Sequence, residues 1–299
     1  MNRLTIDTCP LCDGSHIKHF ITCTDFYASG EQFELFRCDD CSFTFTQGCP
    51  LESEIGKYYE TPDYISHSDT KKGAMNFIYH YVRRHMLNKK AQLVLKETRL
   101  RSGKILDIGT GTGYFANAMQ LRGWEVEAIE KNASARTFAK EHFLLDVKDE
   151  RALNNFPSGS FDVITLWHVM EHLEHLGETW QRIFELLTDR GVLVVAVPNC
   201  ASYDADKYAE HWAAYDVPRH LWHFTPATMQ QWGAKHGFIL AARHPMPFDA
   251  FYVSMLSEKY RGNSSSFFKG VAVGSLAWLS AQAKKERSSS MIYVFRKKR

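Results

Sequence analysis

A glycine-rich loop holds the residues of this chain whose spacing is best suited to chemistry. The stretch from Leu106 to Phe115 is LDIGTGTGYF, with glycine at positions 109, 111 and 113. Glycine lets backbone approach a ligand closely, and a helix start gathers free amides at the positive end of the helix dipole. An apolar strand before this loop and a helix from Tyr114 therefore predict a cradle for a nucleotide-like ligand.

The elements around the loop predict a doubly wound parallel sheet. Short apolar runs alternate with helical patterns from Lys104 to about Val197. Strands are expected at 105–108, 125–129, 143–147, 163–167 and 192–197, with helices at 114–122 and 176–187. Asn132 is placed to cap a further helix. Ligands of such folds bind at the carboxyl ends of the strands, so Glu130, directly after the second strand, belongs to the same site.

The last third of the chain continues this alternation. A helix is expected from Pro226 to Lys235, then a strand at 238–243, helical patterns at 246–260 and 267–284, and a last strand at 291–295. The apolar stretch from Phe267 to Leu279 contains Lys269 and is shorter than the ~20 residues of a membrane-spanning helix. It is predicted to be a buried or docking helix, and no membrane span is expected.

The spacing of the glycines distinguishes this loop from the loop of a dinucleotide-binding fold. The pattern is GxGxG preceded by Asp107, not GxGxxG, and it resembles the first motif of class I S-adenosylmethionine-dependent methyltransferases. FDVITLWHVMEHL (161–173) resembles that family's fourth-strand motif, GVLVVAVPN (191–199) its fifth, and DVPRHLWHFTP (216–226) a segment of its coenzyme-Q-methyltransferase-like subgroup. The resemblance spans roughly residues 70–299. It implies an α/β, Rossmann-like seven-stranded sheet whose last strand is antiparallel.

The same resemblance implies S-adenosylmethionine as the cofactor. Asp107 would hold its ammonium group, Glu130 would accept hydrogen bonds from its ribose hydroxyls, and Asp146 lies where the adenine amine is expected. Trp167 and His168 would line the sulfonium, where aromatic faces favour a cation. The expected cofactor-binding residues are Asp107, Gly109, Thr110, Gly111, Gly113, Tyr114, Glu130, Asp146, Trp167 and His168.

Histidines supply the candidate bases. Methyl transfer needs a base only if the nucleophile carries a proton, and histidine suits that task near neutral pH. His168 and His220 are the candidate catalytic residues. Candidate substrate contacts are Tyr64, His67, Tyr215, Arg219, His220 and His223. The alternatives are that Arg219 and His220 tie their loop to the sheet by hydrogen bonds, and that the tyrosines pack in turns.

Two CxxC pairs near the start predict a metal site. Cys9 and Cys12 are separated from Cys38 and Cys41 by 25 residues, and four thiolates suit tetrahedral zinc. Alternating aromatics around the second pair predict a β-hairpin. The alternative is that some of these cysteines are small buried hydrophobes. The chain is thus expected to divide into a zinc ribbon with a mainly structural metal (1–57), a helical lid or linker (58–100) and a methyltransferase domain (101–299).

The composition of the chain limits the kinds of partner that can be expected. The 299 residues carry 36 Lys and Arg against 34 Asp and Glu, so net charge does not indicate a polyanionic partner. No apolar signal region opens the chain, which makes the cytoplasm the default location. The expected activity is O- or C-methylation of a small molecule with a sugar or quinone- or phenol-like acceptor, because the chain also resembles sugar C-methyltransferases in part. The alternatives are an RNA methyltransferase that uses the ribbon, which Asp13, Asp39 and Asp40 beside the knuckles disfavour, and a non-catalytic cofactor-binding scaffold.

Overall fold

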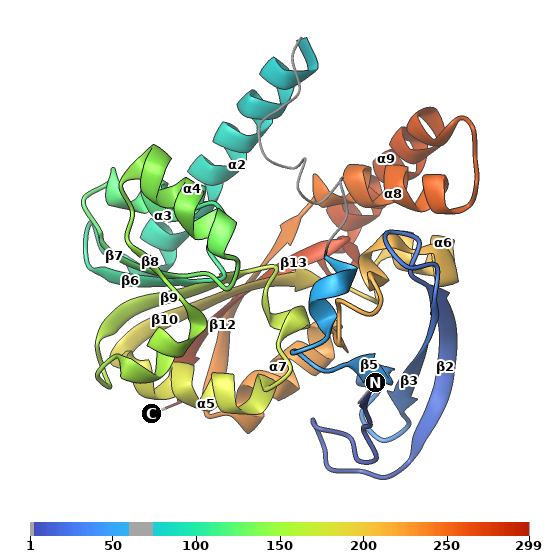
Figure 1. The fold of residues 1–299 in the computed structure, drawn as a ribbon, viewed down its shortest axis with the longest axis horizontal. Helices are drawn as coiled ribbons and strands as arrows, with labels where there is room; N and C mark the ends of the chain where they lie inside the picture. The colour runs from blue at the N-terminus through green and yellow to red at the C-terminus, as the bar shows by residue number, and fades with distance from the viewer. Residues whose placement is uncertain (1–2, 60–73, 299) are drawn as a thin grey trace.

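A seven-stranded sheet forms the centre of the molecule (Figure 1). The computed structural model describes residues 3–59 and 74–298. In the order β12-β13-β10-β9-β6-β7-β8, strand β13 runs antiparallel to both neighbours and the other pairs are parallel. The strands are β6 (Lys104–Ile108), β7 (Glu125–Ile129), β8 (Val147–Lys148), β9 (Phe161–Trp167), β10 (Leu187–Pro198), β12 (Phe238–Met246) and β13 (Ser290–Lys297). The predicted Rossmann-like fold with an antiparallel last strand is confirmed.

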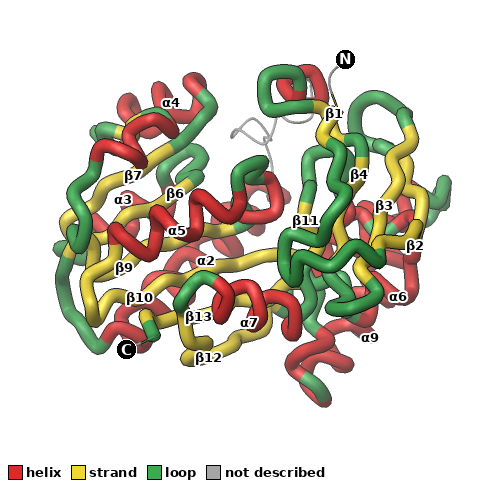
Figure 2. Tube along the Cα trace, turned by 90° about the horizontal axis from the view of Figure 1, so that it is seen from below, coloured by secondary structure: helices red, strands yellow, loops and turns green. Residues whose placement is uncertain are grey.

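Helices cover both faces of this sheet. Helices α2 and α3 pack together on one face, and α5 and α7 lie on the other (Figure 2). The α-helices are α2 (Ala74–Thr98), α3 (Tyr114–Gln120), α4 (Ala133–Phe143), α5 (Leu176–Leu186), α6 (Tyr203–Tyr208), α7 (Pro226–Lys235), α8 (Asp249–Tyr260) and α9 (Ser266–Ala283). Short 3-10 helices are η1 (Ile55–Tyr58), η2 (Glu150–Asn155), η3 (Met170–His172), η4 (Ala209–His211), η5 (Ala213–Tyr215) and η6 (Lys285–Arg287). Among the described residues, no helix combines the length and the apolarity needed to cross a bilayer.

Local chemistry sets several element boundaries as predicted, but the helix expected at 246–260 begins only at Asp249, because β12 continues through Met246. The Asn132 side chain accepts a hydrogen bond from the Ala135 amide and so caps α4. The strand expected at 143–147 is wrong, because α4 continues through Phe143 and β8 starts only at Val147. Leu144 ends the helix in the left-handed conformation, at φ 56°. The apolar residues there belong to the last turn and cap of a helix.

The N-terminal ribbon forms a second sheet that depends on a distant strand. Its strands β2 (Ile17–Thr24), β3 (Gln32–Cys38) and β4 (Thr44–Gln47) are followed at the edge by β11 (Trp222–His223) (Figures 1 and 2). A separate pair joins β1 (Arg3–Leu4) to β5 (Cys49–Pro50). The second knuckle lies in the β3–β4 hairpin, as predicted. The division at residues 57 and 100 stays a prediction, and the ribbon sheet takes its fourth strand from beyond residue 101.

Aromatic packing makes the two sheets share one core. Phe43 of the ribbon stacks on Trp222 with ring centroids 6.1 Å apart, and on Trp232 of α7 at 5.8 Å. Cys9, Cys38 and Phe43 belong to the same buried cluster as the strands of the central sheet. The ribbon therefore shares its hydrophobic core with the central domain and is not a separately packed module.

Candidate active site

The glycine loop follows β6 and leads into α3, and its glycines do different work. Gly109 has φ +68°, and a Cβ there would lie 2.3 Å from Val169 Cγ2. Gly111 has φ +57°, and a Cβ there would meet no protein atom within 4 Å. Gly109 is thus required by the packing of the protein itself, whereas Gly111 leaves an open side on which a ligand can approach the backbone.

Glu130 fixes the open part of this loop. Its Oε2 accepts a hydrogen bond from the Gly111 amide at 2.8 Å, and its Oε1 accepts one from the Asn132 amide at 2.8 Å. Each carboxylate oxygen has a further lone pair, so both can still accept bonds from the hydroxyls of a ligand. The position after β7 that the sequence assigned to a ribose therefore has the required acceptor capacity.

Asp107 offers a buried oxygen with no partner in the protein. Its Oδ1 accepts a hydrogen bond from Thr165 Oγ1 at 2.6 Å, and its Oδ2 is buried and unpaired. Burial raises the pKa of Asp107 to about 6. Unpaired buried carboxylate oxygens are uncommon in folded proteins. With the nearby Thr110 hydroxyl also unpaired, this region fits the ammonium end of S-adenosylmethionine.

Trp167 ends β9 and faces helix α2. Its ring contacts Phe115 edge-on at 5.2 Å between centroids, and its buried Nε1 has no partner. Lys90 Nζ lies 4.4 Å from the Trp167 ring centroid, and burial lowers the pKa of Lys90. Lys90 lies on α2, in a part of the sequence that carries no site motif, and was not among the predicted site residues.

His168 is held between two carboxylates. Its backbone has φ 58°, its Nδ1 lies 3.3 Å from Glu171 Oε1, and its Nε2 lies 3.3 Å from Asp249 Oδ2. Burial alone would lower the pKa of His168, but its bonds to Asp249 and Glu171 outweigh that effect and raise the pKa to about 9. The ring is therefore an imidazolium at neutral pH, a form that cannot accept a proton. Asp249 is a second residue that the sequence analysis missed.

A buried carboxylate and two imidazoles lie close together next to His168. His220 Nδ1 lies 2.9 Å from the Ala214 carbonyl oxygen, and His172 Nδ1 lies 3.0 Å from that of Arg219. Carbonyl oxygens only accept hydrogen bonds, so each Nδ1 carries a proton, and in the neutral form of each ring Nε2 has the lone pair.

Glu171 supplies the carboxylate of this cluster, which consists of Glu171, His172 and His220. Its side chain is 1% exposed, and its Oε2 has no partner. One donor atom from each of the three residues lies within 4.8 Å of the others. Burial and the neighbouring His220 lower the pKa of His172 to about 4. The cluster can accept a proton, and its donor set could also hold a cation.

Three predicted substrate residues instead join the ribbon to the central domain. Arg219 is 3% exposed and donates to Asp25 Oδ1 at 3.0 Å, to Asp216 Oδ1 at 2.7 Å and to the Tyr58 carbonyl. His223 Nε2 lies 2.8 Å from Thr46 Oγ1, and the buried Tyr215 ring packs edge-on against His223. The hydrogen bonds of Arg219 agree with the alternative that it ties its loop to its neighbours.

The remaining predicted residues lie at the margins of the site. Asp146 is exposed and precedes β8, and Tyr114 packs its ring against Phe143 at 4.9 Å. Gly113 caps α3 in the left-handed conformation. Tyr64 and His67 lie outside the described residues.

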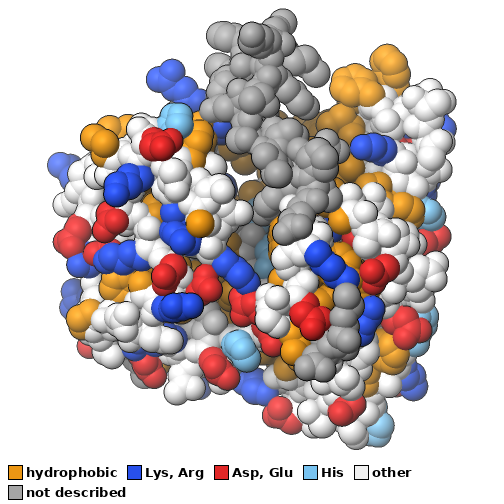
Figure 3. Space-filling view, in the orientation of Figure 1, with side chains coloured by type: hydrophobic (Ala, Val, Ile, Leu, Met, Phe, Trp, Pro, Cys, Tyr) orange, Lys and Arg blue, Asp and Glu red, His pale blue; other side chains and the backbone are white. Residues whose placement is uncertain are grey.

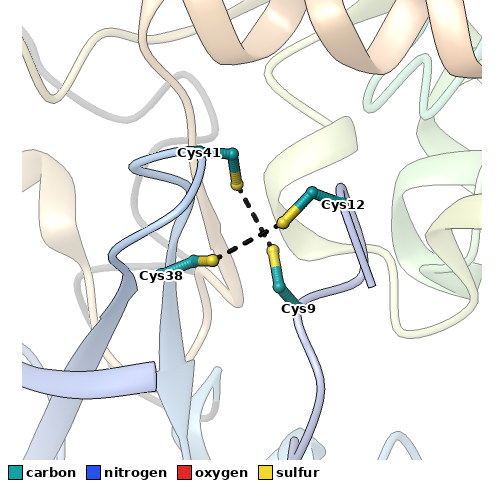
Figure 4. A group of neighbouring side chains, drawn as sticks. All are labelled: Cys9, Cys12, Cys38 and Cys41. Atoms are coloured by element: carbon teal, nitrogen blue, oxygen red, sulfur yellow. Dashed lines mark hydrogen bonds between the residues drawn. The ribbon is translucent and has the colours of Figure 1, made fainter. Parts of the chain in front are cut away.

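The four ribbon cysteines converge on one point (Figure 4). The sulfurs of Cys9 and Cys41 are 3.5 Å apart, those of Cys12 and Cys38 are 3.6 Å apart, and all four lie within 4.8 Å of one another. Cys23 and Cys49 are buried elsewhere and do not join this group. Four converging thiol groups from two tight turns fit a tetrahedral metal ion such as zinc.

Comparison with known proteins gives the family of the central domain. Residues 79–242 match a family model described as a methyltransferase domain. A ubiquinone biosynthesis O-methyltransferase of Rhodopseudomonas palustris (strain TIE-1) is 27% identical over 143 residues, which cover 43% of this chain and 55% of that protein. The mitochondrial enzyme of the same name from Schizosaccharomyces pombe is 34% identical over 112 residues, covering 34% and 41%. The chain thus spans about half the length of the curated relatives it matches.

A solved structure supports the same fold. The crystal structure of a candidate sarcosine dimethylglycine methyltransferase from Galdieria sulphuraria matches with a TM-score of 0.50 at 16% identity. The match covers 72% of this chain and 84% of that one. At this identity the likeness concerns the arrangement of strands and helices.

Proposed function

Because the chain belongs to the methyltransferase-domain family, we propose that it transfers a methyl group from S-adenosylmethionine to an oxygen of a small phenol- or quinone-like acceptor. One observation carries this proposal. The unpaired Asp107 oxygen and the open side of Gly111 lie at the end of β6. Glu171 and His172 follow the adjacent strand β9, and His220 joins them from the segment before β11. A cofactor cradle and a proton acceptor therefore lie at the same edge of the sheet.

The chemistry follows from the protonation of the cluster. S-adenosylmethionine supplies an electrophilic methyl group when it is bound. His220 Nε2 accepts the proton of the acceptor hydroxyl. The oxygen thereby becomes a stronger nucleophile toward the methyl carbon. The buried Glu171 carboxylate stabilises the resulting imidazolium. His168 already carries a proton, so we assign it to lining the site and not to the role of base.

The residues around the ribbon do not favour an RNA substrate. Lys18 Nζ pairs with Asp39 at 2.5 Å, and Lys235 Nζ pairs with Asp13 at 3.1 Å. These pairs neutralise basic side chains that phosphate contacts would need. A small molecule therefore fits the described surface better than a nucleic acid.

Calorimetry with S-adenosylmethionine tests the cofactor. Glu130→Ala removes two charge-assisted hydrogen bonds that order the loop, so its affinity should fall by about 10- to 100-fold, the equivalent of about 1.5–3 kcal/mol. Glu125→Ala is the matched control, because it changes an exposed glutamate at the start of β7, the strand that leads to Glu130, and should bind normally. The proposal fails if the unchanged protein shows no saturable binding.

A methyl-transfer screen tests the acceptor. Catechols and hydroquinones, nucleotide sugars and RNA fragments are offered in parallel, and the expected product is a methyl ether of a phenol. His220→Gln should lower kcat by about 10²- to 10⁴-fold, as expected for loss of a general base. His211→Gln, a change in a half-buried histidine paired with Glu210, should leave kcat unchanged. Methylation of sugars alone would overturn the acceptor class and leave the transferase activity standing.

We also propose that Cys9, Cys12, Cys38 and Cys41 hold one structural zinc ion. The convergence of the four sulfurs supports this, together with the small size of the ribbon, which limits the apolar surface it can bury. Metal analysis of the purified protein should find about one zinc per chain. Replacing Cys38 and Cys41 with serine should remove it.

A further inference from the structure

Helix α9 packs by a single narrow face. The buried face consists of the small residues Gly270, Gly274, Ala277 and Ala281. A Cβ at Gly270 would lie 2.4 Å from Met255 Cα, and one at Gly274 would lie 2.9 Å from Phe251 Cα. The backbones of α8 and α9 therefore lie very close together and form a hairpin that projects beside the sheet (Figure 1).

The outward face of α9 is apolar as well. Phe268 is 77% exposed and Leu279 is 54% exposed. The residues of this face are Phe267, Phe268, Val271, Leu276, Trp278 and Leu279. Hydrophobic side chains are visible at the projecting end of the hairpin (Figure 3). A helix that is apolar on nearly all sides is normally buried, so this face is expected to have a partner.

The charged residues along this stretch are basic. Between residues 259 and 285 there is no Asp or Glu, the flanking Glu258 is buried, and the flanking Glu286 pairs with Arg243 at 2.7 Å. The basic residues of this stretch are Lys259, Arg261, Lys269, Lys284 and Lys285, and all five are exposed. The whole chain has a net charge of only +2, so the hairpin is a local concentration of positive charge.

These charges distinguish two possible partners. In a two-fold contact between copies of this chain, each basic set would face an identical basic set, which is repulsive. Anionic lipid headgroups attract juxtaposed Lys and Arg, by about 1 kcal/mol for each residue near the surface. Lysine stems can also lie along apolar surface while their ammonium groups reach the headgroups.

We propose that the outward face of α9 docks on an anionic lipid surface, with the helix lying in the plane of the interface. The 18 residues of α9 make it about 27 Å long, with Lys269 near one end and Lys284 and Lys285 just beyond the other. Trp278 is suited to the boundary between headgroups and acyl chains. Helix α8 starts at Asp249, the partner of His168, so the docked hairpin is continuous with the candidate active site.

Vesicle flotation tests this docking. The unchanged 299-residue chain is mixed with vesicles of phosphatidylcholine alone or of phosphatidylcholine with phosphatidylglycerol. Binding is expected to be at least about tenfold stronger to the anionic vesicles and to weaken as salt is added. The double variant Phe268→Glu/Leu279→Glu should lose this binding. Leu121→Glu/Leu144→Glu is the matched control, because it changes two exposed leucines elsewhere and should bind like the unchanged protein.

Several outcomes would overturn the proposal. They are absence of binding to anionic vesicles, equal loss in both double variants, or an unchanged lipid preference after Lys269→Glu/Lys284→Glu/Lys285→Glu. A dimer that Phe268→Glu/Leu279→Glu dissociates would assign the face to a second copy. Circular dichroism and thermal melting should match between variants, because each substituted side chain is exposed.

Discussion

At the scale of single residues, Asp107 makes cofactor affinity depend on pH. Burial raises its pKa to about 6, and only its ionised form can pair with an ammonium group. Below pH 6 binding must first displace a proton, so affinity for S-adenosylmethionine should fall by up to about tenfold per pH unit. Calorimetry at pH 7.5 and pH 5 checks this. Asp107→Asn should bind weakly at both values, and a flat profile for the unchanged protein would contradict the assignment.

His168 makes the free energy of unfolding depend on pH above neutrality. Its pKa is about 9 in the folded protein against about 6.5 in the unfolded chain. The stabilisation from its two carboxylate partners is therefore complete below pH 6.5 and is lost as the pH rises through 9. Urea unfolding across this range should show the free energy of unfolding falling. The slope should be shallower in His168→Asn, whose side chain tolerates the left-handed backbone. Equal slopes would refute the imidazolium.

At the scale of elements, Arg219 and Asp25 join the ribbon to the segment before β11. The Asp25 side chain is fully buried, and it also accepts hydrogen bonds from the amides of Tyr27, Ala28 and Ser29. Asp25→Ala would leave the guanidinium with a reduced set of partners in the interior, so the free energy of unfolding should fall by about 3 kcal/mol. Lys18→Ala, which breaks the exposed pair with Asp39, should cost less than about 1 kcal/mol. Chemical denaturation of both variants makes the comparison.

The sequence predicted the elements whose signals are local. Strand alternation and the Asn132 cap located most strands and one helix start of the central domain, and the glycine loop follows the first strand of its sheet as predicted. It could not give Asp249 or Asp25, since their partners His168 and Arg219 are 81 and 194 residues away in the chain. For Gly109, sequence suggested close approach of a ligand, but the contact that forbids a side chain there is with Val169. Pairings of this kind are set by tertiary packing.

At the scale of the whole molecule, removal of the proposed zinc ion should affect more than the ribbon. The knuckle residues Cys9 and Cys38 share a buried cluster with strands of the central sheet. Stripping the metal with a chelator should therefore lower the melting temperature of a single cooperative transition. Calorimetric scans before and after chelation, with zinc added back as the control, check this. A separate, unshifted transition for the central sheet would show that the two parts unfold independently.

The position of β11 also bears on how the chain is made. In its pairing with β4, Trp222 lies opposite Phe45 and His223 opposite Thr44, so the partners are separated by 177 to 179 residues. During synthesis the ribbon emerges before the central sheet, and its outer edge stays open until β10 and the segment after it have left the ribosome. Such a long-range closure is slow compared with local hairpin formation. The ribbon sheet is thus synthesised before the central sheet but is completed only after most strands of the central sheet have been made.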